Sequence, residues 1–161
     1  MNINVRRADA NDLDALTGLF DAYRQFYKQP GDLAAARAFL AERIAHDESV
    51  VLIAEHDAAS IEAEAIGFTQ LYPLFSSVRI GRTWLLNDLY VAPQARRLGA
   101  AHALLDAACA FAHERGALGL ELETGNDNIT AQALYRSAGW VLGENLHFHI
   151  DFAEHRVRTH A

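Results

Sequence analysis

The sequence predicts a mixed α/β (α+β) fold in one domain, residues 1–161, built around a central, mostly antiparallel sheet. First, segments with strand patterns alternate with segments of helical period in the order β-α-α-β-β-β-α-β-α-β. Second, 161 residues, 51% of them hydrophobic, suffice for one domain with a core. Third, residues 83–124 read strand, helix, strand, a unit that requires a right-handed crossover and therefore one parallel pair.

The first half of the chain supplies a strand, two helices and a hairpin. These elements are predicted over residues 3–7, 8–27, 32–47, 50–56 and 64–75. The first helix follows an Asp- and Asn-rich start that can cap it, and Pro30 and Gly31 separate it from the second. The last two segments are rich in β-branched or alternating residues around a polar break, which is typical of an antiparallel hairpin.

The second half supplies the parallel unit and two closing elements. They are predicted as strand 83–91, helix 101–116, strand 119–124, helix 128–140 and strand 145–152. Pro93 ends the first of these strands, and Gly116 and Gly139 stand at the positions where glycine closes a helix. The final segment, NLHFHIDF, alternates polar and apolar residues, the period of a strand with one buried face.

Composition excludes several classes of protein. A net charge of −7 argues against nucleic acid as the main partner, because phosphate-backbone binding needs a basic face. The single cysteine, Cys109, forms no intramolecular disulfide and is predicted to be a buried thiol on an apolar helix face. No apolar run of membrane-spanning length and no leader is evident, so we expect a cytoplasmic protein without a membrane partner.

The stretch PQARRLGAA, residues 93–101, lies between a predicted strand and a predicted helix. The first amides of a helix have no intrahelical partner, and the helix dipole adds partial positive charge, so such a turn binds anions. Gly99 and Ala101 let a phosphate approach, while Arg96 and Arg97 can add charge-assisted contacts. The alternative is a solvated arginine pair. The stretch matches neither a Walker loop nor a dinucleotide-binding GxGxxG.

With the context of this stretch, the chain resembles the GNAT superfamily of acyl-CoA-dependent N-acetyltransferases. The resemblance rests on LLNDLYVAPQARRLGAAHALLDAA, then LELET, then N-x-x-A-x-x-LY-x-x-x-GW, and covers residues 83–140 in detail. Arg96, Gly99 and Ala101 fit the family pattern Gln/Arg-x-x-Gly-x-Gly/Ala, whereas Arg97 stands where relatives often have glycine. The upstream LLNDLYV resembles the diamine acetyltransferase-like branch, with Asn87 in place of a glutamate.

The resemblance implies acetyl-CoA as co-substrate, in a V-shaped opening where strands 83–91 and 119–124 splay apart. Backbone groups of one strand would pair with the pantetheine arm, and the amides of residues 97–102 would hold the pyrophosphate. The implied cofactor contacts are Leu89, Tyr90, Val91, Arg96, Arg97, Leu98, Gly99, Ala100, Ala101, His102, Asn128 and Tyr135. Asn128 is equally a candidate N-cap for the helix that follows it.

Direct transfer to an amine requires a base and an acid. An alkylamine is mostly protonated at neutral pH, and the candidate carboxylates that would accept its proton are Asp88 and Glu123. By the same resemblance Tyr135 is the general acid for the departing thiolate, the alternative being an aromatic side chain that packs on the sheet. The predicted substrate contacts are Tyr27, Asn87, Asp88 and Glu123; for Tyr27 core packing is the alternative, and for Glu123 a solvated edge.

We therefore expect an enzyme that acetylates a primary amine of a small molecule, namely a diamine, polyamine or amino-acid-like compound. The alternatives are a CoA-binding regulatory module with weak catalysis, and an acetyltransferase for protein N-termini or lysines. His147 and His149 share a strand face without a clear third ligand, so no metal is expected. The resemblance also implies a homodimer.

Overall fold

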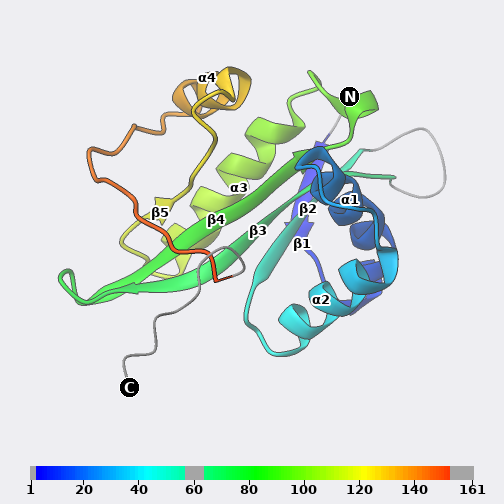
Figure 1. Cartoon of the computed structure of the whole chain (residues 1–161), viewed down its shortest axis with the longest axis horizontal. Helices are drawn as coiled ribbons and strands as arrows, with labels where there is room; N and C mark the ends of the chain where they lie inside the picture. The colour runs from blue at the N-terminus through cyan, green and yellow to red at the C-terminus, as the bar shows by residue number, and fades with distance from the viewer. Residues whose placement is uncertain (1–2, 57–63, 153–161) are drawn as a thin grey trace.

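Figure 1 shows the computed structural model, which describes residues 3–56 and 64–152. Its centre is a five-stranded sheet in the order β1-β2-β3-β4-β5. The strands are β1 (Ile3–Arg7), β2 (Val50–His56), β3 (Glu64–Ser76), β4 (Gly81–Val91) and β5 (Leu120–Glu121). Neighbouring strands are antiparallel from β1 to β4, and β4 and β5 are parallel. The predicted mixed sheet with one parallel pair is confirmed.

Helices cover both faces of the sheet (Figure 1). They are α1 (Leu13–Phe26), α2 (Leu33–Ala45), α3 (Ala100–Glu114) and α4 (Ile129–Ser137), with short 3-10 turns η1 (Ala10–Asp12) and η2 (Pro93–Ala95). α1 and α2 bury Leu16, Phe20 and Leu40 against Phe68 on one face. α3 buries its own apolar stripe against the opposite face. The sheet therefore lies between two helix layers and separates two hydrophobic cores.

The apolar stripe of α3 contains Leu104, Leu105, Ala108 and Phe111. Cys109 lies next to this stripe and is exposed, so the prediction of a buried thiol is wrong. Each residue of an α-helix turns by about 100° relative to the one before it, which carries Cys109 off the face that Ala108 occupies.

A β-bulge in β4 decides where the acidic residue of LLNDLYV points. Gln70 pairs with Asp88 and Leu71 pairs with Leu86, so Asn87 is the extra residue. Leu86 belongs to the core beneath α3, whereas Tyr90 belongs to the core beneath α1 and α2. In a regular strand these two residues would share a face, so the bulge turns the second half of β4 toward α1 and α2.

The parallel pair is short. Trp84 pairs with Leu120 and Leu85 with Glu121, and β5 ends there, although the sequence predicted a strand over 119–124. The apolar pattern indicates burial but does not specify how long two strands stay within hydrogen-bonding distance. From Leu86 to Val91 the side of β4 that faces away from β3 therefore has no strand partner among the described residues.

The final predicted strand, 145–152, is not formed. Its apolar residues are exposed: Leu146, Phe148, Ile150 and Phe152 have exposed fractions of 83%, 85%, 59% and 73%. A strand needs a hydrogen-bonding partner as well as an alternating pattern, and within the described part of this single chain the segment pairs with no sheet edge. The sequence alternates as a strand does, but it does not specify which strand the segment would pair with.

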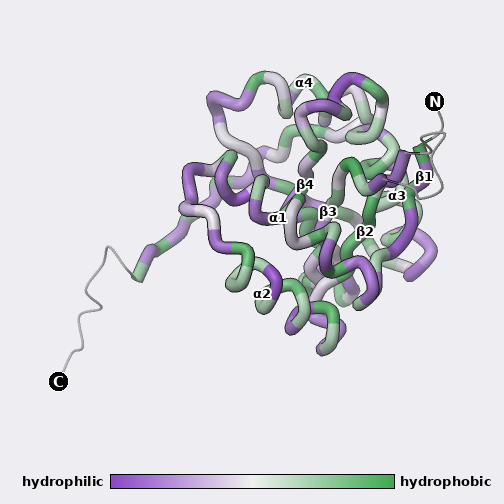
Figure 2. The backbone as a smooth tube through the Cα atoms, turned by 90° about the vertical axis from the view of Figure 1, so that its right-hand side faces the viewer, coloured by the Kyte–Doolittle hydropathy of each residue, from purple (hydrophilic) through white to green (hydrophobic). Residues whose placement is uncertain are grey.

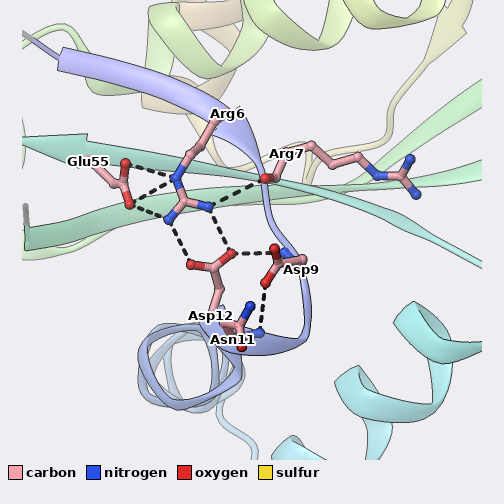
Figure 3. A network of polar contacts seen from close by, with 6 residues as sticks. All are labelled: Arg6, Arg7, Asp9, Asn11, Asp12 and Glu55. Carbon is pink, nitrogen blue, oxygen red and sulfur yellow. Dashed lines mark hydrogen bonds and ion pairs between the residues drawn. The ribbon is translucent and has the colours of Figure 1, made fainter.

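A cluster of charged side chains ties the start of α1 to the sheet (Figure 3). Arg6 on β1 contacts Asp12 at 2.7 Å and Glu55 on β2 at 2.5 Å. Asp9 and Asp12 form a capping box around η1. The guanidinium of Arg6 lowers the pKa of Asp12. These contacts fix α1, and with it the aromatic residues further along that helix, relative to β1 and β2.

Candidate active site

The turn between β4 and α3 presents free backbone amides. The first intrahelical hydrogen bond of α3 runs from the amide of Ala103 to the carbonyl of Gly99 at 3.0 Å. The amides of Ala100, Ala101 and His102 therefore precede the bonded part of the helix. Gly99 adopts the left-handed conformation with φ +90°, and a Cβ added there would meet no protein atom within 4 Å. This open helix N-terminus can bind an anion such as a phosphate.

The two arginines of the turn differ in their surroundings. Arg96 folds back, and its Nε donates to the carbonyl of Val91 at 3.3 Å. Arg97 adopts φ +64°, a backbone conformation that residues other than glycine rarely take. This explains why glycine is suited to position 97, where the sequence has arginine. Both side chains are exposed.

Asp88 lies at a cavity of about 310 Å³ between β4 and the helices α1 and α2. Phe20, Tyr23, Phe39, Tyr72 and Asn87 form most of the remaining wall. Asp88 is only 4% exposed. Its carboxylate accepts hydrogen bonds from Gln70 Nε2 at 2.7 Å and from Asn87 Nδ2 at 3.0 Å. Tyr23 lines the same cavity, and its phenol counteracts the rise in the pKa of Asp88. Asn87 and Asp88, both predicted from the sequence, are adjacent in the chain, and the bulge allows both side chains to line the same cavity.

Burial raises the pKa of Asp88 above that of an ordinary aspartate. Burial and the nearby carboxylate likewise raise the pKa of Tyr23, and burial raises that of Tyr72 to about 12. Both phenols therefore stay protonated at neutral pH. A carboxylate with an elevated pKa and little contact with water is a stronger base than an exposed one, which suits it to accept a proton from a substrate.

Tyr135 lies half-buried on α4 and lines a second, larger pocket of about 730 Å³. Its ring packs near Trp140, with 6.3 Å between centroids. Burial raises the pKa of Tyr135, and Tyr27 adds to this effect. Asp88, Tyr27 and Tyr135 also raise the pKa of Tyr23. The three phenols and the buried carboxylate are therefore close enough to influence one another electrostatically. The ring of Tyr135 thus packs near Trp140 while its half-buried side chain lines the larger pocket.

Glu123 does not join Asp88 in the smaller cavity. It lines the larger pocket, is 66% exposed and contacts His147 at 3.0 Å. Asn128 caps α4, because its Oδ1 accepts from the amide of Ala131 at 3.1 Å. The predicted capping role is confirmed, while contact with a cofactor stays a prediction. Among the described residues, no group of three or more His, Cys, Asp or Glu side chains could hold a metal.

Tyr27 is half-exposed at the end of α1, and its ring contacts Tyr23 at 5.1 Å between centroids. Tyr23, one turn earlier, is the residue that reaches the cavity. Two residues of the site were not predicted from the sequence. Gln70 donates a hydrogen bond to Asp88, and Arg24 lines the cavity. A signal for Gln70 was present in the sequence, because Thr69 and Gln70 are polar residues in the middle of a strand with apolar residues on either side.

A parallel pair that ends after Leu120 and Glu121, a helix N-terminus with free amides and a buried carboxylate beside tyrosines are features that an acetyltransferase of the resembled family requires. The model of the acetyltransferase (GNAT) family matches residues 16–140. The chain therefore belongs to the GNAT family of acetyltransferases. No helix within the described ranges has both the length and the apolar character needed to cross a membrane.

Relatives agree with this assignment. An uncharacterized N-acetyltransferase, YhfO, of Bacillus subtilis is 47% identical over 86% of this chain and 89% of its own length. A probable acetyltransferase of Haemophilus influenzae is 35% identical over 66% and 70%. A crystal structure of a probable acetyltransferase aligns with a TM-score of 0.85 and 38% identity, covering 92% of this chain and 98% of the other. The diamine acetyltransferase-like branch finds no support among these relatives.

Proposed function

We propose that this protein transfers an acetyl group from acetyl-CoA to a primary amine of a small molecule. The observation that carries the proposal is the buried carboxylate of Asp88 at a small cavity, next to the unpaired side of β4. A cavity of about 310 Å³ has room for about ten water-sized groups, which favours a small acceptor over a protein chain. Acetyl-CoA supplies the activated acyl group.

The turn before α3 fits the phosphates of acetyl-CoA. The amides of residues 97–102 would hold the pyrophosphate, and Gly99 leaves the approach open. The unpaired side of β4 at Leu89, Tyr90 and Val91 would hydrogen-bond the pantetheine arm as a neighbouring strand does. These residues bind and orient the co-substrate between β4 and β5.

Asp88 would accept a proton from the bound ammonium, which leaves the nitrogen lone pair free to attack the thioester carbonyl carbon. As the new C–N bond forms, the C–S bond breaks, and the Tyr135 phenol donates its proton to the departing thiolate. The nitrogen then loses its second proton, which returns to the Tyr135 phenolate, so that the products are the N-acetylated amine, free CoA thiol and protonated Asp88. The raised pKa of Asp88 supports its role as the base, because burial makes its carboxylate more basic. Glu123, at the pocket of Tyr135, is the second candidate for the base.

The test is acceptor-dependent release of CoA thiol from acetyl-CoA across a panel of primary amines, with the Tyr135→Phe variant alongside. Turnover that needs both the amine and the phenol is expected. Tight acetyl-CoA binding without turnover for any amine would instead favour a regulatory module.

We further propose that two copies of the chain associate through residues 145–152, here called the C-terminal segment. Figure 2 shows hydrophobic and hydrophilic residues alternating along the stretch that leads to the C-terminus. The outer side of β5 pairs with no strand among the described residues, so the chain carries both an open sheet edge and a strand-like segment. Pairing between two copies would supply hydrogen-bonding partners to both the open sheet edge and the C-terminal segment. It would also bury the exposed apolar side chains of the segment.

A further inference from the structure

The cavity at Asp88 contains two charged side chains of opposite sign, Asp88 and Arg24. Resting on the proposed transferase function, we infer that the acceptor is a compact amino acid whose amine meets Asp88 and whose carboxylate meets Arg24. Diamines, which carry a second positive charge in place of the carboxylate, are then poor acceptors.

Asp88 retains capacity for one more donor. A carboxylate offers roughly four lone-pair positions. Gln70 and Asn87 donate to two of them. An ammonium group that enters the cavity can take a position that these two donors leave open. It would also restore a neighbouring positive charge to a carboxylate that is 4% exposed and lacks an ion pair within the described residues.

Arg24 is held loosely at the other charged position. Its Nη1 contacts Asp21 Oδ1 at 3.3 Å. Asp21 is already fixed by two shorter bonds of 2.8 Å, from Gln25 Nε2 and from the amide of Asp32. A guanidinium has five N–H donors, and a carboxylate can take two of them in a bidentate pair. Arg24 therefore has donors to offer a ligand without breaking the fold around Asp21.

The space between the charged groups is apolar. Phe20 and Phe39 stack with 5.7 Å between ring centroids, and Tyr72 completes the wall. An apolar wall excludes water, which strengthens both the attraction of Arg24 for a carboxylate and its repulsion of a second ammonium. This local effect opposes the net charge of −7, which alone would favour polycationic acceptors through the long-range field.

The experiment measures kcat/KM for three acceptors with the same four-carbon chain: γ-aminobutyrate, butylamine and putrescine, which end in a carboxylate, a methyl group and an ammonium. Phenylalanine and phenethylamine form a second pair that tests a ring in the aromatic cavity. The variants are Arg24→Gln, Arg24→Lys and, as a matched control, Arg37→Gln, which removes an exposed arginine of α2 that pairs with Asp14. Thermal melting confirms that each variant folds.

We expect the carboxylate member of each set to exceed its uncharged partner by at least about 10-fold in kcat/KM, and putrescine to be poorest. Arg24→Gln should lower kcat/KM far more for the carboxylate acceptors than for butylamine and so remove this preference, Arg24→Lys should restore part of it, and Arg37→Gln, outside the cavity, should change nothing. Equal or better turnover of the uncharged and dicationic amines, or an unaltered preference in Arg24→Gln, would overturn the inference and leave the transferase function intact. Absence of turnover with every amine, these included, would overturn both.

Discussion

Gln70 and Asp88 are paired residues of β3 and β4, and the side-chain amide of Gln70 donates to the Asp88 carboxylate at 2.7 Å. The other end of that amide, Oε1, is buried without a partner among the described residues. An unmet acceptor beside a buried acid is costly for folding. The pair therefore fixes the Asp88 side chain at the cavity at some expense in stability.

Asp88→Asn tests this relationship. A rotated Gln70 amide can accept from the new Asn side chain through Oε1, so the variant should fold. We expect kcat to fall by about 10²- to 10⁴-fold, because the base is lost. Steady-state kinetics with a saturating amine provide the measurement. An unchanged kcat would move the role of base to Glu123, and Glu123→Gln is the variant to compare.

The same substitution has a pH signature. Because the pKa of Asp88 is raised in the folded protein, the unfolded chain loses this proton first, and folding stability declines as pH rises from the unfolded pKa through the folded one. Asp88→Asn should therefore gain thermal stability relative to the parent at pH 7, and gain less near pH 4. In the parent, the acidic limb of kcat should lie above the ordinary aspartate pKa and should vanish in the variant.

Tyr135→Phe separates proton donation from packing. The phenylalanine ring keeps the contact with Trp140, so stability should change little, whereas kcat should fall by about 10²-fold through loss of the acid. The dissociation constant of CoA, measured by calorimetry, should stay within error. If Tyr135 only packs, kcat will survive in Tyr135→Phe and will fall, together with the melting temperature, in Trp140→Ala.

Gly99→Val tests whether backbone amides dominate at the turn before α3. A β-branched residue at φ +90° is strained by at least about 1–2 kcal/mol and tilts the free amides, while its side chain extends into the space where a phosphate would lie. The KM for acetyl-CoA should rise far more than in Arg96→Gln or Arg97→Gln. Equal effects in the three variants would show that side-chain charge dominates instead.

Local patterns predicted most of the fold, and pairing partners account for the errors. The β2–β3 hairpin, both sheet faces and the glycine ends of α3 and α4 follow from periodicity and from residues such as Gly116 and Gly139, which have positive φ. In contrast, the bulge at Asn87 depends on the register with β3, and it is this bulge that turns Asp88 toward Tyr23 and away from Glu123. Sequence spacing identifies candidate groups, but register decides which of them meet.

The C-terminal segment provides the last prediction. Phe148 and Ile150 share one face of a potential strand and are 85% and 59% exposed, a state that water disfavours and a second copy can relieve. Light scattering of the 17.8 kDa chain should give twice that mass, and hydrogen exchange should show protected amides in residues 145–152. Phe148→Asp with Ile150→Asp should yield monomers, whereas His149→Ser, on the opposite face, should leave dimers. Protection of these amides in a protein of monomeric mass would mean that the segment pairs within its own chain, and the proposed association would then be wrong.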